Sequence, residues 1–309
     1  MLNGARAYGE CVAAAHWGRV TYAMIWEVWT AASQEGFSMN AESLVECLEN
    51  LEPIFVQAGQ AARRMQGSVK RYNKLQTGNP AIDIVTEADL ATQESILGAM
   101  RSTSLIGCRL LAEEDTKSVQ AFASESNFYL GIDPIDGTAV YARGGEHFSS
   151  IVSLHNGEKF LYMFIYFPAW DWTLKIARGR YTASGGPPNL SMFDRLERTV
   201  AFWSGNPTAT ISSETLAAIK AKGLEFRKMS SLGIRSGTIE LFALGKIAGV
   251  YYENMNVYDG CAEYVIASGR GQPLYSDSTS GNLQLSDIRQ SAKGNYYPGY
   301  YLVLTNPLK

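Results

Sequence analysis

Histidine and cysteine are scarce in this chain, which bears on metal sites and disulfides. Its 309 residues include three histidines and four cysteines, and the cysteines are too far apart for CxxC metal knuckles or a dense disulfide framework. No HExxH motif occurs, so a zinc site with histidine ligands is not expected. The pattern favours buried thiols in a reducing compartment, and we therefore expect a cytoplasmic protein.

Charge is also scarce. Charged residues make up 18% of the chain, with 27 Lys and Arg against 30 Asp and Glu, which gives a net charge of −3. A surface that binds nucleic acid usually shows a basic excess, so no nucleic acid polymer is expected as a partner. The low charged fraction and the 46% apolar content suit a chain with a large core.

The sequence has no long uninterrupted hydrophobic run. The apolar-leaning segment Cys11–Ala32 carries His16, Arg19 and Glu27. A membrane-spanning helix needs about 20 mostly apolar residues, and a signal peptide needs a clean apolar block after a basic start. We therefore expect no membrane partner and interpret residues 1–38 as a helical N-terminal extension.

Apolar periodicity and loop signals predict the elements of the first half. Intervals of three and four between apolar residues predict a helix over Ser43–Ala62, begun by a capping box of Ser43 and Glu46. A second helix is predicted over Leu90–Met100. An Asn-Gly pair predicts a hairpin, and apolar runs predict strands over 128–132, 149–154, 159–167 and 174–177. The first half is therefore expected to combine helices with a largely antiparallel sheet.

A Gly- and Pro-rich stretch, Ser184–Asn189, is the strongest loop signal in the chain. We place a boundary there between two subdomains, 39–186 and 187–309. Beyond it, predicted strands alternate with predicted helices: strands over 200–203 and 250–252, and helices over 214–222, 238–246 and 261–268. This alternation predicts an α/β second half.

One stretch places two carboxylates directly after a predicted buried strand. Asp133 and Asp136 lie in the sequence Asp-Pro-Ile-Asp-Gly-Thr, which ends at Thr138. These are common turn residues, so the stretch alone is also consistent with an ordinary turn. A phosphate site would use the carboxylates as hard oxygen ligands for Mg²⁺ and backbone N–H groups as a cradle for phosphoryl oxygens. Gly137 permits close backbone approach for such a cradle.

Two further acidic clusters precede this stretch, and one aspartate follows it. Glu113-Glu114-Asp115 alone is typical of a solvated acidic loop, and Asp83–Asp89 is typical of a strand end followed by an acidic first helical turn. Asp259 stands just before a predicted helix. The four features in this order are much more specific than any one of them.

In this order the motifs resemble those of the inositol monophosphatase family, the lithium-sensitive, Mg²⁺-dependent phosphatases. The family's D-P-I-D-G-T is present unchanged at Asp133–Thr138, and its D-x-V-T-x-x-D resembles Asp83–Asp89. Its G-E-E and W-D-x-A-A resemble Ala112–Glu114 and Tyr258–Ala262. The resemblance covers roughly residues 39–309.

The resemblance implies a sugar-phosphatase-like fold with α-β-α-β-α layers, combining α+β and α/β parts. It implies an antiparallel sheet in the first half and a mixed sheet in the second. Subdomain 39–186 would bind metal, subdomain 187–309 would complete the active site, and the protein would be a homodimer.

The metal ligands are carried over from the family position by position. Glu113, Asp133 and the carbonyl oxygen of Ile135 would hold a first Mg²⁺. Asp133, Asp136 and Asp259 would hold a second, and Glu113 would also serve a weaker third site. The resemblance therefore implies two Mg²⁺ ions, with room for a third.

The remaining site residues come from the same resemblance. Asp83 and Thr138 would form a hydrogen-bonded pair near the nucleophilic water, and Glu113 would share this catalytic role. The backbone N–H groups of Gly137 and Thr138 would bind phosphate, and Glu253 would contact substrate hydroxyls.

These residues imply a phosphoric monoester hydrolase that acts on a small phosphorylated metabolite. A phosphate monoester dianion repels hydroxide, and two cations about 3.5–4 Å apart can activate water and stabilise the leaving alkoxide. The favoured substrate is inositol monophosphate or a related sugar phosphate. No covalent enzyme nucleophile is required.

Other functions stay open on the same fold: a 3′(2′),5′-bisphosphate nucleotidase, a fructose-1,6-bisphosphatase-like enzyme, a histidinol-phosphate phosphatase or a non-catalytic ligand-binding member. Departures from the family near the substrate, including Tyr258 for the usual Trp and Ala139 for the usual Thr, leave this choice undecided. A haloacid-dehalogenase phosphatase is disfavoured, because its D-x-D motif has one residue between the aspartates and this chain has two.

Overall fold

The computed structural model describes residues 40–68, 71–73, 84–232, 237–257, 261–272, 274–276, 288–291 and 294–306. The N-terminal extension expected over 1–38 lies outside these residues. Residues Ala41–Lys309 cluster as one compact unit, and the boundary placed after residue 186 stays a prediction. None of the helices in the described ranges has the length and apolar character needed to cross a membrane.

Two long helices form the first layer: α2 (Ala41–Met65) and α4 (Glu87–Met100). Leu44, Leu48 and Phe55 are among the residues that α2 buries, so the predicted periodicity marks its inner face. The expected capping box at Ser43 is wrong, because the helix begins two residues earlier and Ser43 lies inside its first turn.

The first sheet has six strands in sequential order: β3 (Arg109–Ala112), β4 (Tyr129–Asp136), β5 (Ser149–His155), β6 (Phe160–Phe167), β7 (Trp172–Ala177) and β8 (Arg180–Ser184). All neighbours are antiparallel except β3 and β4, which are parallel. The predicted hairpin between β5 and β6 is confirmed, with Gly157 at φ 95° and Asn156 Oδ1 accepting the N–H of Lys159 at 3.0 Å.

The second sheet is mixed, as the resemblance implies. Its order is β10 (Glu225–Lys228), β9 (Thr199–Phe202), β11 (Gly249–Asn256), β14 (Gly294–Leu304) and β12 (Leu274–Ser276), with β13 (Arg289–Ser291) also paired to β14. The first three strands are parallel, and β14 runs antiparallel to its partners. A separate antiparallel pair joins β1 (Arg71–Asn73) and β2 (Ile84–Thr86).

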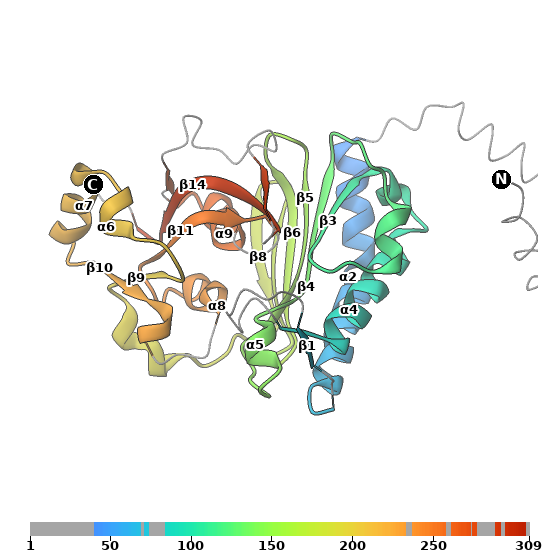
Figure 1. Cartoon of the computed structure of the whole chain (residues 1–309), viewed down its shortest axis with the longest axis horizontal. Coiled ribbons are helices and arrows are strands. Elements are labelled where there is room, and N and C mark those ends of the chain that lie inside the picture. The colour runs from blue at the N-terminus through green and yellow to red at the C-terminus, as the bar shows by residue number, and fades with distance from the viewer. Residues whose placement is uncertain are drawn as a thin grey trace, which may run out of the picture. The chain divides into compact units, whose positions relative to one another are not determined.

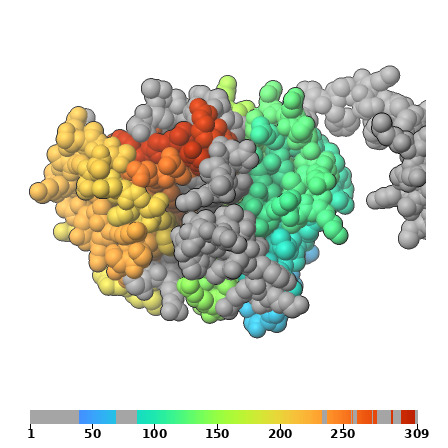
Figure 2. Space-filling view, in the orientation of Figure 1, coloured from blue at the N-terminus to red at the C-terminus, as the bar shows by residue number. Residues whose placement is uncertain are grey.

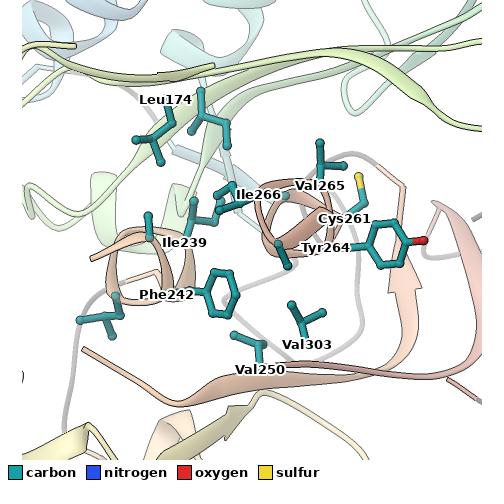
Figure 3. Close-up of a cluster of buried hydrophobic side chains, with 14 of the residues drawn as sticks. Leu174, Ile239, Phe242, Val250, Cys261, Tyr264, Val265, Ile266 and Val303 are labelled. Carbon is teal, nitrogen blue, oxygen red and sulfur yellow. The ribbon is translucent and has the colours of Figure 1, made fainter. Parts of the chain in front are cut away.

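Helices α8 (Thr238–Ala243) and α9 (Ala262–Gly269) lie between the two sheets. Figure 3 shows both helices end-on, with Leu174 of the first sheet on one side and Val250 and Val303 of the second on the other. Every residue of β5 is buried, which follows because helices cover both faces of its sheet.

The outer face of the second sheet is covered by α6 (Pro207–Thr210) and α7 (Ser213–Ala221). Ile211, which follows α6, and Ile219 of α7 pack in one apolar cluster with Val200 and Tyr251 of the sheet. The α-β-α-β-α layering is therefore confirmed (Figure 1). In the space-filling view, the green and cyan part of the chain and the yellow to red part occupy opposite sides of the face shown (Figure 2). Within the described ranges, the remaining short helices are η1 (Ser104–Gly107), η2 (Lys117–Ala121), α5 (Thr138–Tyr141), η3 (Ser191–Leu196) and η4 (Met229–Ser231).

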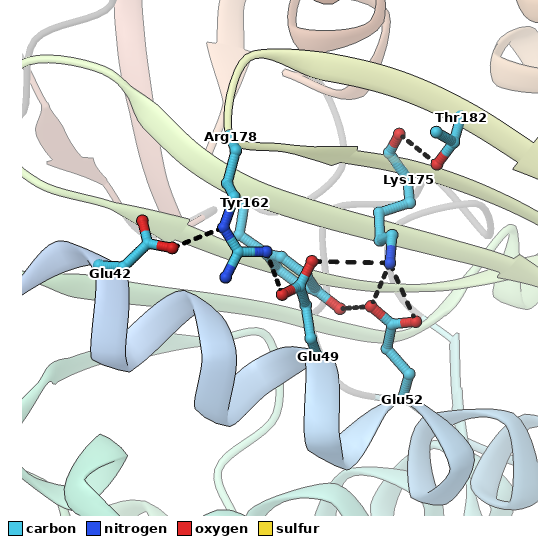
Figure 4. Close-up of polar contacts among 7 residues, drawn as sticks. All are labelled: Glu42, Glu49, Glu52, Tyr162, Lys175, Arg178 and Thr182. Atoms are coloured by element: carbon cyan, nitrogen blue, oxygen red, sulfur yellow. Dashed lines mark hydrogen bonds and ion pairs between the residues drawn. The ribbon is translucent and has the colours of Figure 1, made fainter.

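A polar network fixes α2 to the first sheet (Figure 4). Glu52 accepts hydrogen bonds from Lys175 Nζ at 3.0 Å and from Tyr162 Oη at 3.1 Å. Arg178, in the β7–β8 turn, pairs with Glu42 and Glu49. The amphipathic helix is thus held by charge as well as by apolar packing.

Candidate active site

The aspartate stretch belongs to β4 rather than to a turn after it. The strand was expected to end at Ile132 but continues to Asp136, with a bulge against β5 between Asp133 and Asp136. Pro134 has no N–H to continue the ladder, and its carbonyl accepts a hydrogen bond from Ser150 Oγ at 2.7 Å. The bulge therefore sets the offset between the two aspartates at the end of a buried strand.

Gly137 makes the sharp turn that follows. Its φ is +88°, a left-handed conformation that favours glycine, and a Cβ at this position would lie 3.1 Å from the carbonyl oxygen of His147. Thr138 then begins α5. Close backbone approach at Gly137 is therefore built into the fold, while phosphate binding by Gly137 and Thr138 stays a prediction.

Glu113 lies beside Asp133 because of the one parallel pair in the first sheet. The register aligns Ala112 of β3 with Ile132 of β4, and Glu113 N donates to Ile132 O at 3.0 Å. Carboxyl ends of parallel strands meet at the same sheet edge, so the two predicted ligands leave adjacent strands together. Asp133 is buried and Glu113 is half-buried.

The acidic loop after β3 is fixed from α4. Gln93 donates through Nε2 to the carbonyl oxygen of Glu114 at 2.6 Å and accepts the N–H of Glu114 at Oε1 at 3.1 Å. This two-way contact between an amide side chain and the backbone holds the residue next to Glu113. Gln93 could not be identified from the sequence, because the contact joins two separate elements.

Thr138 makes two buried contacts. Its hydroxyl lies 2.9 Å from the carbonyl oxygen of Ile135 and 3.2 Å from Oδ1 of Asp89. The expected partner, Asp83, lies outside the described residues. Among the described residues, Thr138 has a carboxylate partner in Asp89, the last residue of the same motif, and the pairing with Asp83 stays a prediction.

Asp89 is fully buried at the N-terminus of α4. Its Oδ2 accepts hydrogen bonds from Thr86 N at 2.8 Å and Thr86 Oγ1 at 2.5 Å, and the bond from Thr86 N is one half of a capping box in which the Thr86 side chain accepts a backbone N–H. Burial raises the pKa of the Asp89 carboxyl to about 6, although the hydrogen bonds from Thr86 favour its ionised form. The Thr-x-x-Asp spacing could have predicted this cap from the sequence.

Glu253 lies in β11, where Thr210 Oγ1 donates to its Oε1 at 3.0 Å. A Cβ on Gly205, whose φ is +88°, would lie 2.2 Å from Oε2 of the same carboxylate. Glu253 thus sits against the loop that follows β9, and its contact with substrate stays a prediction.

His147 and Glu240 form a further pair that sequence reasoning did not anticipate. His147 Nδ1 lies 2.9 Å from Oε1 of the buried Glu240, and its ring packs edge-on against Trp170. The pair joins the loop beside Gly137 to α8. Neither residue belongs to a recognisable local motif.

Asp83 and Asp259 lie outside the described residues, so the structure does not locate two of the predicted site residues. Within the described ranges, no group of three or more His, Cys, Asp or Glu side chains forms a metal-holding cluster. The donors at the end of β4 are carboxylate and carbonyl oxygens, the type that Mg²⁺ prefers. The donor chemistry therefore fits a hard divalent cation, and the ligand set stays a prediction.

The model of the inositol monophosphatase family matches residues 41–283. The chain belongs to this family. It is therefore a phosphoric monoester hydrolase by family. A comparison with curated proteins found no sequence match.

Solved structures of family members share the fold. An IMPase from Thermotoga maritima matches with a TM-score of 0.55 at 20% identity, covering 83% of this chain and 91% of that one. An IMPase/NADP phosphatase complexed with Mg²⁺ and phosphate matches with a TM-score of 0.57 at 17% identity, covering 85% and 92%. A staphylococcal inositol monophosphatase-1 soaked in LiCl as an inhibitory complex matches with a TM-score of 0.57 at 16% identity, covering 88% and 93%.

Proposed function

We propose that the chain is a Mg²⁺-dependent phosphomonoesterase that hydrolyses a small phosphorylated polyol, with inositol monophosphate or a related sugar phosphate as substrate. The observation that carries the proposal is the end of β4, where Asp133, Ile135 and Asp136 present oxygen donors next to Glu113. The Mg²⁺ and phosphate in a related structure support the same assignment.

Two Mg²⁺ ions bound there would neutralise the phosphate and activate water. The proposed side-chain ligands Glu113, Asp133, Asp136 and Asp259 carry four negative charges, which balance two divalent cations before substrate binds. The carbonyl oxygen of Ile135 would be a further Mg²⁺ ligand, and Glu113 would also bind a third ion more weakly. These residues assemble the positive charge that a phosphate dianion requires.

The protein groups around the phosphate have separate roles in this proposal. The N–H groups of Gly137 and Thr138 orient the phosphoryl oxygens, because the left-handed turn at Gly137 allows close approach of the backbone. The hydroxyl of Thr138 orients the attacking water, and Asp83 and Glu113 share this role. The leaving alkoxide departs without a covalent enzyme intermediate.

Glu253 is proposed to recognise the alcohol part of the substrate. Its carboxylate is half-buried and held by Thr210, so it can accept hydrogen bonds from substrate hydroxyls without first losing much conformational freedom. Glu253→Gln is expected to raise KM for polyol phosphates more than for an aryl phosphate, which has no neighbouring hydroxyls.

The test is a panel of inositol, sugar and nucleotide phosphates with histidinol phosphate, assayed for phosphate release with and without Mg²⁺. The proposal predicts Mg²⁺-dependent hydrolysis, with the highest kcat/KM for inositol monophosphate or a related sugar phosphate. Preference for a bisphosphate nucleotide would contradict the proposed substrate but leave the proposed Mg²⁺-dependent hydrolysis intact. A folded protein that hydrolyses no ester would favour the non-catalytic ligand-binding alternative.

Two further family properties belong to the proposal. Li⁺ is expected to inhibit turnover, since it would occupy a metal position with too little charge, and a related structure contains LiCl as an inhibitor. A homodimer is expected, and light scattering of the purified chain would test it.

A further inference from the structure

The Thr138 hydroxyl has one proton and faces two acceptors among the described residues. The carbonyl oxygen of Ile135 lies at 2.9 Å, and Oδ1 of Asp89 lies at 3.2 Å. A hydroxyl donates one hydrogen and keeps lone pairs for accepting. The two contacts therefore compete, and the oxygen that takes the proton decides where the lone pairs of Thr138 point.

The Asp89 carboxylate cannot turn freely to meet Thr138. Both hydrogen bonds from Thr86 end on Oδ2, and the side chain has no exposed surface. The capping box therefore uses one carboxylate oxygen and directs the other at a residue 49 positions further along the chain. Capping the helix uses only Oδ2, so capping does not account for the contact between Oδ1 and Thr138.

We propose that Asp89 is a positioning residue that accepts the hydrogen bond of the Thr138 hydroxyl. This leaves the Ile135 carbonyl available as a metal ligand and turns a Thr138 lone pair toward the attacking water. The inference rests on the proposed function, in which that carbonyl oxygen is a ligand. It gives to Asp89 the hydrogen bond with Thr138 that the resemblance gave to Asp83. Asp89 acts through Thr138 and does not itself touch substrate.

The decisive variant is Asp89→Asn. The two donors of Thr86 require an oxygen at the Oδ2 position, so the amide NH₂ of the variant would face Thr138 and donate to it. The Thr138 hydroxyl would then donate to the Ile135 carbonyl and compete with Mg²⁺ there. Residues that orient ligands from outside the ligand set typically change affinity or activity about 10- to 100-fold, and we expect Mg²⁺ affinity and kcat to fall by that amount, with KM nearly unchanged.

The experiment measures Mg²⁺ binding by calorimetry and turnover by phosphate release, in a cycle with Thr138→Val. Without the hydroxyl, Asp89→Asn should cause no further loss of Mg²⁺ affinity or kcat, although it should still lower the melting temperature. Glu87→Gln is the matched control, because it removes a charge from the same helical turn and leaves the Asp89–Thr138 contact in place. It should change neither readout.

Equal losses from Asp89→Asn in the wild-type and Thr138→Val backgrounds would overturn the role of Asp89 and leave the phosphatase assignment intact. A wild-type protein without Mg²⁺-dependent hydrolysis would overturn both. If Asp89→Asn does not fold, Thr86→Val offers a second route, because it removes one of the two donors that fix the carboxylate. It should cause a smaller loss that again disappears without the Thr138 hydroxyl, and persistence of that loss would contradict the proposal.

Discussion

Two buried contacts near the end of β4 join residues that lie far apart in the sequence. Asp89 lies 49 positions before Thr138, and Gln93 lies 21 positions before Glu114. The motif residues were identifiable because they are adjacent in the chain. Their partners could not be assigned, because a cap at Thr86 and Asp89 gives no information on which distant hydroxyl faces the second carboxylate oxygen.

The raised pKa of Asp89 predicts a pH dependence of stability. Burial and the charge of Glu114 raise the folded-state pKa to about 6 from an ordinary 3.8. Because the folded pKa is the higher one, the contribution of this group is complete below pH 4 and is lost as the pH rises to about 6. Relative to Asp89→Asn, the metal-free wild type should lose up to about 3 kcal/mol of unfolding free energy over this interval.

Urea unfolding of both proteins between pH 4 and 7 measures this difference. Asp115→Asn, at an exposed position of the neighbouring acidic loop, is measured in parallel as the control. A flat difference curve for Asp89→Asn would show that the carboxyl titrates normally in the folded chain.

At the scale of elements, the end of α2 holds the segment after the active-site turn. Gln66 Nε2 donates to the carbonyl oxygens of Tyr141 and Gly145 at 3.1 and 2.6 Å, and Tyr141 Oη donates to Ala62 O at 2.7 Å. Gln66→Met would leave two carbonyl groups without these partners. We expect a loss of about 1–2 kcal/mol in unfolding free energy and weaker inhibition by inorganic phosphate.

Thermal unfolding and product inhibition test this prediction together. Gln57→Met makes the same chemical change at an exposed position within α2 and should alter neither. Unchanged phosphate inhibition in Gln66→Met would mean that the α2 contact stabilises α5 without positioning the turn.

The middle of α2 offers a test of stability alone. Lys175 contacts Glu52, which also accepts the hydroxyl of the buried Tyr162 (Figure 4). Lys175→Met leaves a half-buried carboxylate without its cation, and we expect a loss of about 1–2 kcal/mol. Lys159→Met, at an exposed position, should cost much less, and equal losses measured in urea would contradict the role given to the network.

For the whole molecule, the sequence predicted individual helices and strands more completely than it predicted how the strands pair. β5, β6 and β7 were predicted because apolar runs lie between clear turn signals, and α2 because its burial follows the helical period. β14 was missed because it contains Pro298 and Gly299, which argue against a strand. These residues fall where its register with β11 shifts, beside Asn254 at φ 56°, so the irregular pairing accommodates the proline.

The most direct measurement of the central claim compares phosphate release by the wild type, Asp133→Asn and Asp115→Asn across a Mg²⁺ titration, on the best ester of the panel. Asp133 is the buried carboxylate proposed to serve both ions, whereas Asp115 is an exposed acid two residues beyond Glu113. The account predicts that turnover requires Mg²⁺, that Asp133→Asn lowers kcat by about three orders of magnitude or more while remaining folded, and that Asp115→Asn retains wild-type rates. Near-wild-type turnover by Asp133→Asn at saturating Mg²⁺, or turnover by the wild type without divalent metal, would contradict it.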